Sequence, residues 1–141
     1  MTWDPSKPIL EIENLSISFF TRLREIPAVM DFSCTVMAGE AMGLVGESGC
    51  GKSTTGRSIL RLVEPSAGQV HFGGKDVGLL GKADLQAMRR QMQMIFQDPF
   101  ASLNPRKTIG AAIAEPIIVH GVATRAEALD RTAALLRRVG L

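Results

Sequence analysis

Alternation of apolar and polar side chains marks the first third of the chain. Between residues 9 and 20, apolar residues at positions 10, 12, 15, 17 and 19 are interleaved with glutamates and serines. A period of two is typical of a half-buried strand, here expected to pair antiparallel. The phase slips near Asn14, which indicates either two short pieces or a β-bulge. A second alternation predicts a strand over residues 29–37, through Phe32, Cys34 and Val36.

Two further runs are mainly apolar and lack this alternation. Ala41–Val45 is apolar on both faces and directly precedes a glycine-rich loop, which is typical of a central strand in a parallel sheet. Met92–Phe96 is predicted to form another apolar strand, and Gln69–Phe72 a short one ended by two glycines. The resemblance described below places the partners of the two apolar strands elsewhere, so their edges are expected to be unpaired in this chain.

Helical patterns occupy the middle and the end of the chain. They predict helices over residues 52–62, 83–90 and 108–119, and Pro116 is expected to kink or split the last of these. Thr124 and Glu127 form a capping box that opens a final helix reaching to about Val139. The apolar stripe predicted for that helix consists of Leu129, Ala133, Leu136 and Val139.

Composition narrows the class of protein. The chain has 141 residues, 45% hydrophobic and 21% charged, with a net charge of +2, which excludes intrinsic disorder and favours one globular domain. No pattern dedicated to nucleic acid stands out. The longest uncharged run has ten residues, Pro65–Gly74, against the roughly 18 needed for a transmembrane helix. Two cysteines and an N-terminus without a signal-peptide pattern favour a reducing cytoplasm.

A phosphate-binding motif carries the chemistry of the sequence. Residues 46–53 read Gly-Glu-Ser-Gly-Cys-Gly-Lys-Ser, which matches G-x-x-x-x-G-K-[ST] between an apolar run and a helical pattern. Glycines allow the backbone to approach phosphate oxygens closely, and successive N–H groups can form an anion-binding nest at the positive end of a helix. Lys52 can reach the β- and γ-phosphates, and Ser53 can present a hydroxyl to Mg²⁺.

Plainer interpretations of the same residues remain open. The segment could be an ordinary glycine-rich turn between a strand and a helix. Cys50 could be a reactive thiol near a helix N-terminus, although filling a loop position is the simpler interpretation. His71 and His120 lack metal-ligand spacing with either cysteine.

The combined motifs resemble the ATP-binding subunits of ABC transporters, in particular the oligopeptide/dipeptide importer branch. Residues 46–54 look like the Walker A motif of that branch. Phe96–Arg106, which reads Phe-Gln-Asp-Pro-Phe-Ala-Ser-Leu-Asn-Pro-Arg, looks like its Q-loop and the stretch after it. Glu64–Val70 resembles the turn after the Walker A helix. The resemblance runs from about Ile9 to Leu141.

This resemblance implies roles for individual residues. The cofactor-binding set is Phe19, Gly46, Ser48, Gly49, Cys50, Gly51, Lys52, Ser53 and Thr54. Within it, Phe19, or alternatively Phe20, would stack on adenine, since stacking needs only an aromatic face. Lys52 and Gln97 would be the catalytic residues. Ser53 and Gln97 would contact Mg²⁺, with Gln97 also coupling the site to a membrane subunit.

The resemblance also implies an incomplete domain. No Leu-Ser-Gly-Gly-Gln signature, no apolar run ending in Asp-Glu after Lys52 and no switch histidine occur. The expected fold class is an α/β P-loop NTPase of the ABC ATP-binding-domain type, represented by its N-terminal part. Its divisions would be a β-rich and Walker A core over residues 9–96, a Q-loop region over 97–107 and the start of a helical subdomain over 108–141.

The implied function is the ATP-binding component of an ABC importer for peptides or related small solutes, an ATPase that uses ATP and Mg²⁺. Its partners would be transmembrane permease subunits, a second ATP-binding subunit and a separate solute-binding protein, with no nucleic acid. It would be cytoplasmic, peripheral on the inner face of the cell membrane. This chain alone is expected to bind ATP without turnover.

Two rival hypotheses come from other classes. One is a different P-loop enzyme, such as a small-molecule kinase or a GTPase, although no Asn-Lys-x-Asp motif is present. The other is a truncated, non-catalytic fragment that binds nucleotide or a partner.

Overall fold

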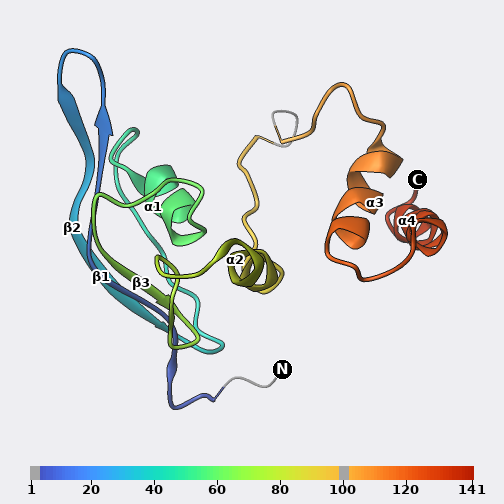
Figure 1. Cartoon of the computed structure of the whole chain (residues 1–141), viewed down its shortest axis with the longest axis horizontal. Coiled ribbons are helices and arrows are strands. Elements are labelled where there is room, and N and C mark those ends of the chain that lie inside the picture. Colours follow the sequence, from blue (N-terminus) through green and yellow to red (C-terminus); the bar gives the residue numbers. More distant parts are fainter. Residues whose placement is uncertain (1–3, 99–101) are drawn as a thin grey trace. The chain divides into compact units, whose positions relative to one another are not determined.

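A computed structural model describes residues 4–98 and 102–141. The chain divides into two compact units, one within residues 1–94 and the other within residues 95–141 (Figure 1). The first unit contains a sheet and two short helices, and the second contains two helices. None of the helices in the described part of the chain is long and apolar enough to cross a membrane.

An antiparallel four-stranded sheet forms the frame of the first unit. Its spatial order is β2-β1-β3-β4, so that β1 lies between β2 and β3 (Figure 1). The strands are β1 (Pro8–Phe20), β2 (Glu25–Met37), β3 (Ala67–Phe72) and β4 (Lys75–Asp76). Antiparallel pairing of the alternating segments is therefore confirmed, and β2 begins four residues earlier than the predicted 29–37.

The phase slip at Asn14 is a β-bulge. Asn14 has φ 49°, and the register of β1 against β2 shifts between Ile12 and Leu15. Its backbone N–H leaves the ladder and donates to Ser33 Oγ at 2.8 Å. The register of this strand pair shifts at four points, and the last of them lies near the start of β2, where Ile17 faces Val29 and Ser18 faces Pro27. Ala28, between those two partners, is the extra residue of this irregularity.

The hydrophobic core lies on one face of the sheet and is closed by residues from beyond β4. The two largest side chains with no exposure, Leu15 and Ile17, come from the central strand β1. The buried cluster consists of Ile12, Leu15, Ile17, Val70, Phe72, Val77 and Met88. The predicted alternation therefore selects the correct face of β1.

The described residues form four helices, two in each unit. They are α1 (Lys52–Ile59), α2 (Lys82–Arg89), α3 (Ile109–Val119) and α4 (Arg125–Arg138). Pro116 lies inside α3 without splitting it, so that part of the expectation is wrong. A proline removes a single i→i−4 bond, and here it sits in the last turns of a helix that packs against α4.

The capping box of α4 is confirmed, but the predicted apolar stripe has the wrong phase. Glu127 Oε2 accepts from the Thr124 backbone N–H at 2.8 Å, and this bond lowers the pKa of the Glu127 carboxyl. The buried residues of α4 are Ala128 and Thr132, whereas Leu129 is 56% exposed. Small side chains allow two helices to approach closely. A prediction that follows the large apolar residues therefore misses buried positions occupied by small ones.

Neither of the two predicted apolar strands forms in the described residues. Ala41–Val45 and Met92–Phe96 are both irregular, and Val45 and Ile95 are 93% and 97% exposed. A strand exists only when a neighbour accepts and donates its backbone hydrogen bonds, and the sheet of this unit ends at β2 and β4. The strand predictions are therefore wrong for this chain, and the exposed apolar side chains agree with the expectation that these segments lack partners.

Glycine at position 68 is required by the bulge of β1. Gly68 has φ +86°, and a Cβ there would lie 2.4 Å from the Asn14 carbonyl oxygen. Gly74, in the β3–β4 turn, also has a positive φ of 75°, but a Cβ there meets nothing within 4 Å.

We predict that Gly74→Ala destabilises the chain by about 1–2 kcal/mol through backbone strain alone. Gly68→Ala should cost about 1–3 kcal/mol more, because the clash adds to the strain. Urea unfolding measures the free energy of unfolding of both variants. Equal losses would contradict the close packing of Gly68 against Asn14.

Candidate phosphate-binding site

The glycine-rich loop links the irregular segment 41–45 to the first turn of α1. Gly49 and Gly51 have φ values of 82° and 97°, in the left-handed region that favours glycine. Gly51 is the N-cap residue of α1, and no side chain caps this end of the helix. The positive end of the α1 dipole is therefore left to other partners, as expected where an anion binds.

Close packing against β2 fixes the end of the loop. A Cβ at Gly51 would lie 2.4 Å from the Ala28 carbonyl oxygen and 3.0 Å from Val29 Cγ2. The loop backbone thus lies directly on the bulge of β2. This contact with β2 was not predicted from the sequence, where its signal is the break in the alternation of β2 near Pro27.

Lys52 spans the loop with its ammonium group. Its Nζ donates to the carbonyl oxygens of Gly46 at 2.7 Å and Glu47 at 2.6 Å, and lies 3.4 Å from Cys50 Sγ. A Cβ at Gly46 would lie 2.6 Å from the same sulfur, so the loop is closed tightly around the lysine. The ammonium is held by neutral carbonyls, over which an anionic phosphate would compete favourably because charge-assisted hydrogen bonds are stronger.

The remaining loop residues differ in exposure. Ser48, Cys50 and Ser53 are exposed, and Thr54 is half-buried. Thr55 is buried and its Oγ1 donates to the Gly51 carbonyl oxygen at 3.1 Å, which ties the first turn of α1 to its N-cap. Cys50 is a free thiol, as is Cys34, whose pKa is raised by burial.

The aromatic candidates lie at the end of β1 nearest the loop. Phe19 pairs with Ile26, two residues before the Ala28 carbonyl that contacts the loop, or roughly 7 Å along an extended strand. Phe19 is 45% exposed, and Phe20, on the opposite face, is 74% exposed. Phe19 shares its face with the buried Ile17, so it extends the core face toward the loop.

Gln97 belongs to the second unit and is exposed. Three residues of the Q-loop-like stretch, 99–101, lie outside the described residues. Beyond them, Ser102 Oγ donates to the Asp98 carbonyl oxygen at 2.6 Å, and Asn104 Oδ1 accepts from the Arg106 backbone N–H at 2.9 Å.

A cavity of about 320 Å³ adjoins the loop. Its walls are β2 residues, the apolar segment before the loop and the first turn of α1, including Val29, Leu44, Val45, Cys50, Lys52 and Thr55. Among residues 4–98 and 102–141, no three histidines, cysteines or acidic residues cluster as metal ligands. Mg²⁺ needs no such cage when phosphate oxygens and water complete its shell, so a serine hydroxyl at the start of α1 fits it.

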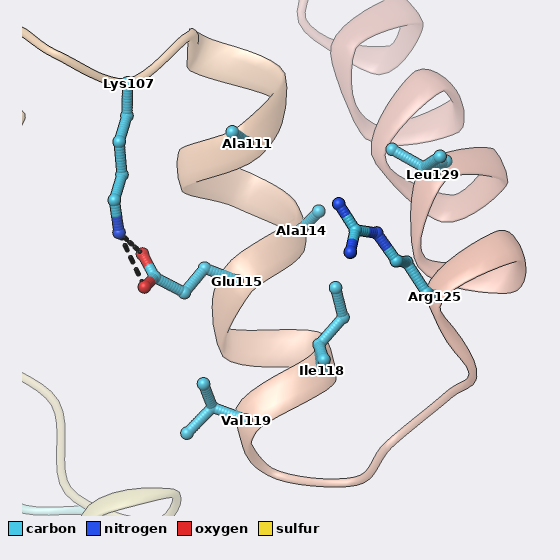
Figure 2. Close-up of a pocket in the computed structure, with 8 residues that line it drawn as sticks. All are labelled: Lys107, Ala111, Ala114, Glu115, Ile118, Val119, Arg125 and Leu129. Carbon is cyan, nitrogen blue, oxygen red and sulfur yellow. Dashed lines mark hydrogen bonds and ion pairs between the residues drawn. The ribbon is translucent and has the colours of Figure 1, made fainter.

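A second cavity, of about 420 Å³, lies between α3 and α4 (Figure 2). Its lining residues are Lys107, Ala111, Ala114, Glu115, Ile118, Val119, Arg125 and Leu129. Lys107 Nζ contacts both carboxylate oxygens of Glu115 at 2.6 Å, while the Arg125 side chain extends from the start of α4 toward α3 (Figure 2). This cavity was not predicted from the sequence. Its lining comes from two helices, and no sequence motif links its residues, such as the ion pair of Lys107 and Glu115.

Comparison with known proteins identifies the family. A family model described as ABC transporter matches residues 29–141. The chain belongs to the ABC transporter family.

Two curated relatives are named glutathione import ATP-binding protein GsiA. Those of Pectobacterium atrosepticum and Escherichia coli K12 are each 49% identical to this chain, over 143 and 142 residues. Each alignment covers 96% of this chain and 23% of the relative, so the chain spans about a quarter of their length.

Solved structures confirm the fold class. The dimeric ATP-binding cassette MJ0796 in a post-hydrolysis state with ADP and Pi superposes with a TM-score of 0.74 at 24% identity. The match covers 91% of this chain and 56% of that one. A second dimeric structure of the same bacterial ABC transporter cassette gives 0.73 at 23% identity. The chain therefore has the fold of part of an ABC cassette.

Alanine substitutions at Gly49 and Gly51 distinguish the cost of backbone strain from the cost of a steric clash, because both glycines have a positive φ and only Gly51 lies close to β2. We predict that Gly51→Ala lowers the melting temperature more than Gly49→Ala, because a Cβ at Gly49 meets nothing within 4 Å. The expected extra cost is about 1–3 kcal/mol, or roughly 4–8 °C per kcal/mol for a unit of this size. Indistinguishable melting curves for the two variants would argue against contact between the loop and β2.

Proposed function

We propose that this chain is the nucleotide-binding front part of the ATP-binding component of an ABC importer for peptides or related small solutes. The observation that carries the proposal is the position of the Lys52 ammonium, held across a glycine-rich loop at the uncapped N-terminus of α1. Membership of the ABC transporter family agrees with it. The GsiA relatives are named as import proteins, which favours import over export.

In this proposal the loop binds the phosphates of ATP. The backbone of Gly46 and of residues 48–54 surrounds them, and Lys52 turns from the carbonyls of Gly46 and Glu47 to the β- and γ-phosphates. The uncapped end of α1 adds a favourable electrostatic field for the negative charge. Bound Mg²⁺ would neutralise charge on the β- and γ-phosphates, and Ser53, in the first turn of α1, would hold it.

The adenine would stack on Phe19. This side chain is partly exposed and lies at the sheet end that adjoins the loop, whereas Phe20 is on the other face. Stacking on an aromatic face contributes affinity without requiring a hydrogen-bonding pattern on the base.

Gln97 would contact Mg²⁺ and the water beside the γ-phosphate, and would couple the site to a membrane subunit. Its exposure leaves the side-chain amide available for both contacts. In-line phosphoryl transfer also needs a group that orients water and charge stabilisation from an opposing face. The sequence contains no Leu-Ser-Gly-Gly-Gln motif and no apolar run ending in Asp-Glu after Lys52. We therefore expect these 141 residues to bind ATP without turnover, since hydrolysis requires the parts of an ABC cassette that they lack.

The proposed partners are transmembrane permease subunits, a second ATP-binding subunit and a separate solute-binding protein, with the protein peripheral on the cytoplasmic face of the membrane. The similar solved structures are of a dimeric cassette, which supports the second subunit. The division of the chain into a core over residues 9–96, a Q-loop region over 97–107 and a helical part over 108–141 belongs to the same proposal.

Binding of a fluorescent ATP analogue with Mg²⁺ tests the site. We predict that Lys52→Ala weakens binding about 10–100-fold, because one charge-assisted contact contributes about 1.5–3 kcal/mol. Lys75→Ala is the matched control, since it removes the same charge from an exposed lysine at the start of β4. Equal affinities of wild type and Lys52→Ala would overturn the assignment.

A further inference from the structure

The C-terminal end of α1 is held by side chains from other segments, unlike its N-terminal end. Arg89, the last residue of α2, donates from Nε and Nη2 to the Leu60 carbonyl oxygen at 3.1 and 3.0 Å. Its Nη2 also donates to the Arg61 carbonyl oxygen at 2.8 Å. These carbonyls are at the negative end of the α1 dipole, where a cation is stabilising.

Arg61 completes the fixation from within the turn that ends α1. The Leu62 N–H bonds to the Arg57 carbonyl and the Arg61 N–H to the Ser58 carbonyl, both at 2.8 Å, which is the Schellman pattern. Arg61 therefore takes the left-handed position, with φ 51°, that glycine normally occupies. An arginine persists there because its Nη1 donates to the carbonyls of Leu80 at 2.7 Å and Val77 at 3.3 Å.

The N-terminal end of α1 has no capping side chain, and its contact with the sheet is the packing of Gly51 against the Ala28 carbonyl of β2. The segment leading into its loop, Ala41–Val45, is irregular and exposed. A cavity of about 400 Å³ lies along the helix, lined by Gly56, Ile59 and Leu60 together with residues 91–94. An eight-residue helix is about 12 Å long and moves as a rigid rod, so a tilt at one end displaces the other.

We propose that Arg89 and Arg61 form a two-arginine clamp that positions α1, and through it the phosphate loop. Both are positioning residues, since they hold the backbone of α1 at the end opposite the loop. This inference rests on the proposed function, because it assigns the clamp to the geometry of the same ATP site. A displacement of about 1 Å at a binding site is enough to cost much of its efficiency.

Affinity for Mg-ATP in the full chain tests the clamp, with Arg89→Ala, Arg89→Lys and Arg90→Ala compared with wild type. Arg90 is exposed and adjacent, so Arg90→Ala removes the same charge outside the clamp. We expect Arg89→Ala to bind about tenfold more weakly. Arg89→Lys should lie between it and wild type, because one ammonium replaces a fork that reaches two carbonyls. Arg90→Ala should match wild type.

Two readouts separate positioning from general stability. Affinity is measured at a temperature where each variant is folded, because a role confined to stability would leave the affinity of the folded protein unchanged. Amide hydrogen exchange at residues 55–59, whose N–H groups bond within α1 or to its N-cap, should be faster in Arg89→Ala than in Arg90→Ala. Wild-type affinity and wild-type exchange in a folded Arg89→Ala would overturn the proposal. If Arg89→Ala does not fold, Arg89→Lys decides in the same way.

The parallel variant Lys52→Ala distinguishes this proposal from the function on which it rests. Loss of binding in Lys52→Ala with normal binding and exchange in Arg89→Ala would reject the clamp alone. Equal binding by wild type and Lys52→Ala would reject the ATP site, and the exchange rates at residues 55–59 would then decide the clamp.

Discussion

One backbone contact holds the glycine-rich loop, residues 46–53, against the sheet. Gly51 approaches the Ala28 carbonyl so closely that a Cβ would be 2.4 Å from the oxygen. The contact is possible because Ala28 is the extra residue of a β2 irregularity and because Gly51 adopts φ 97°. Gly51 is the N-cap of α1, so this contact also sets the position of the first turn of α1, which begins at Lys52. The same bulge lies next to the strand pair that carries Phe19.

Local signals in the sequence predict much of the frame. The alternation of β1, the bulge at Asn14 and the capping box of α4 each depend on neighbouring residues, and each is confirmed. The loop motif likewise marks the start of α1, although its ligand contacts stay a prediction. The family and fold class follow from the two motifs together and are confirmed by the comparisons.

Features that depend on distant segments were not predictable. The strands expected at Ala41–Val45 and Met92–Phe96 do not form among the described residues. An apolar run indicates that a segment can be buried in a sheet, but it does not indicate whether a neighbouring strand is present to pair with it. The contact between Gly51 and β2, the Lys107–Glu115 ion pair and the two-arginine clamp join residues whose spacing forms no motif. In α4, the buried residues are the small Ala128 and Thr132, which are not members of the predicted apolar stripe.

Nucleotide is proposed to bind at residues 46–54, beside the sheet end that carries Phe19. Amide NMR of the isotope-labelled chain during titration with Mg-ATP tests it most directly. We predict the largest chemical-shift changes in residues 46–54, and a second group of changes around Phe19. Changes concentrated at the α3–α4 cavity, with the glycine-rich loop unaffected, would contradict the central claim.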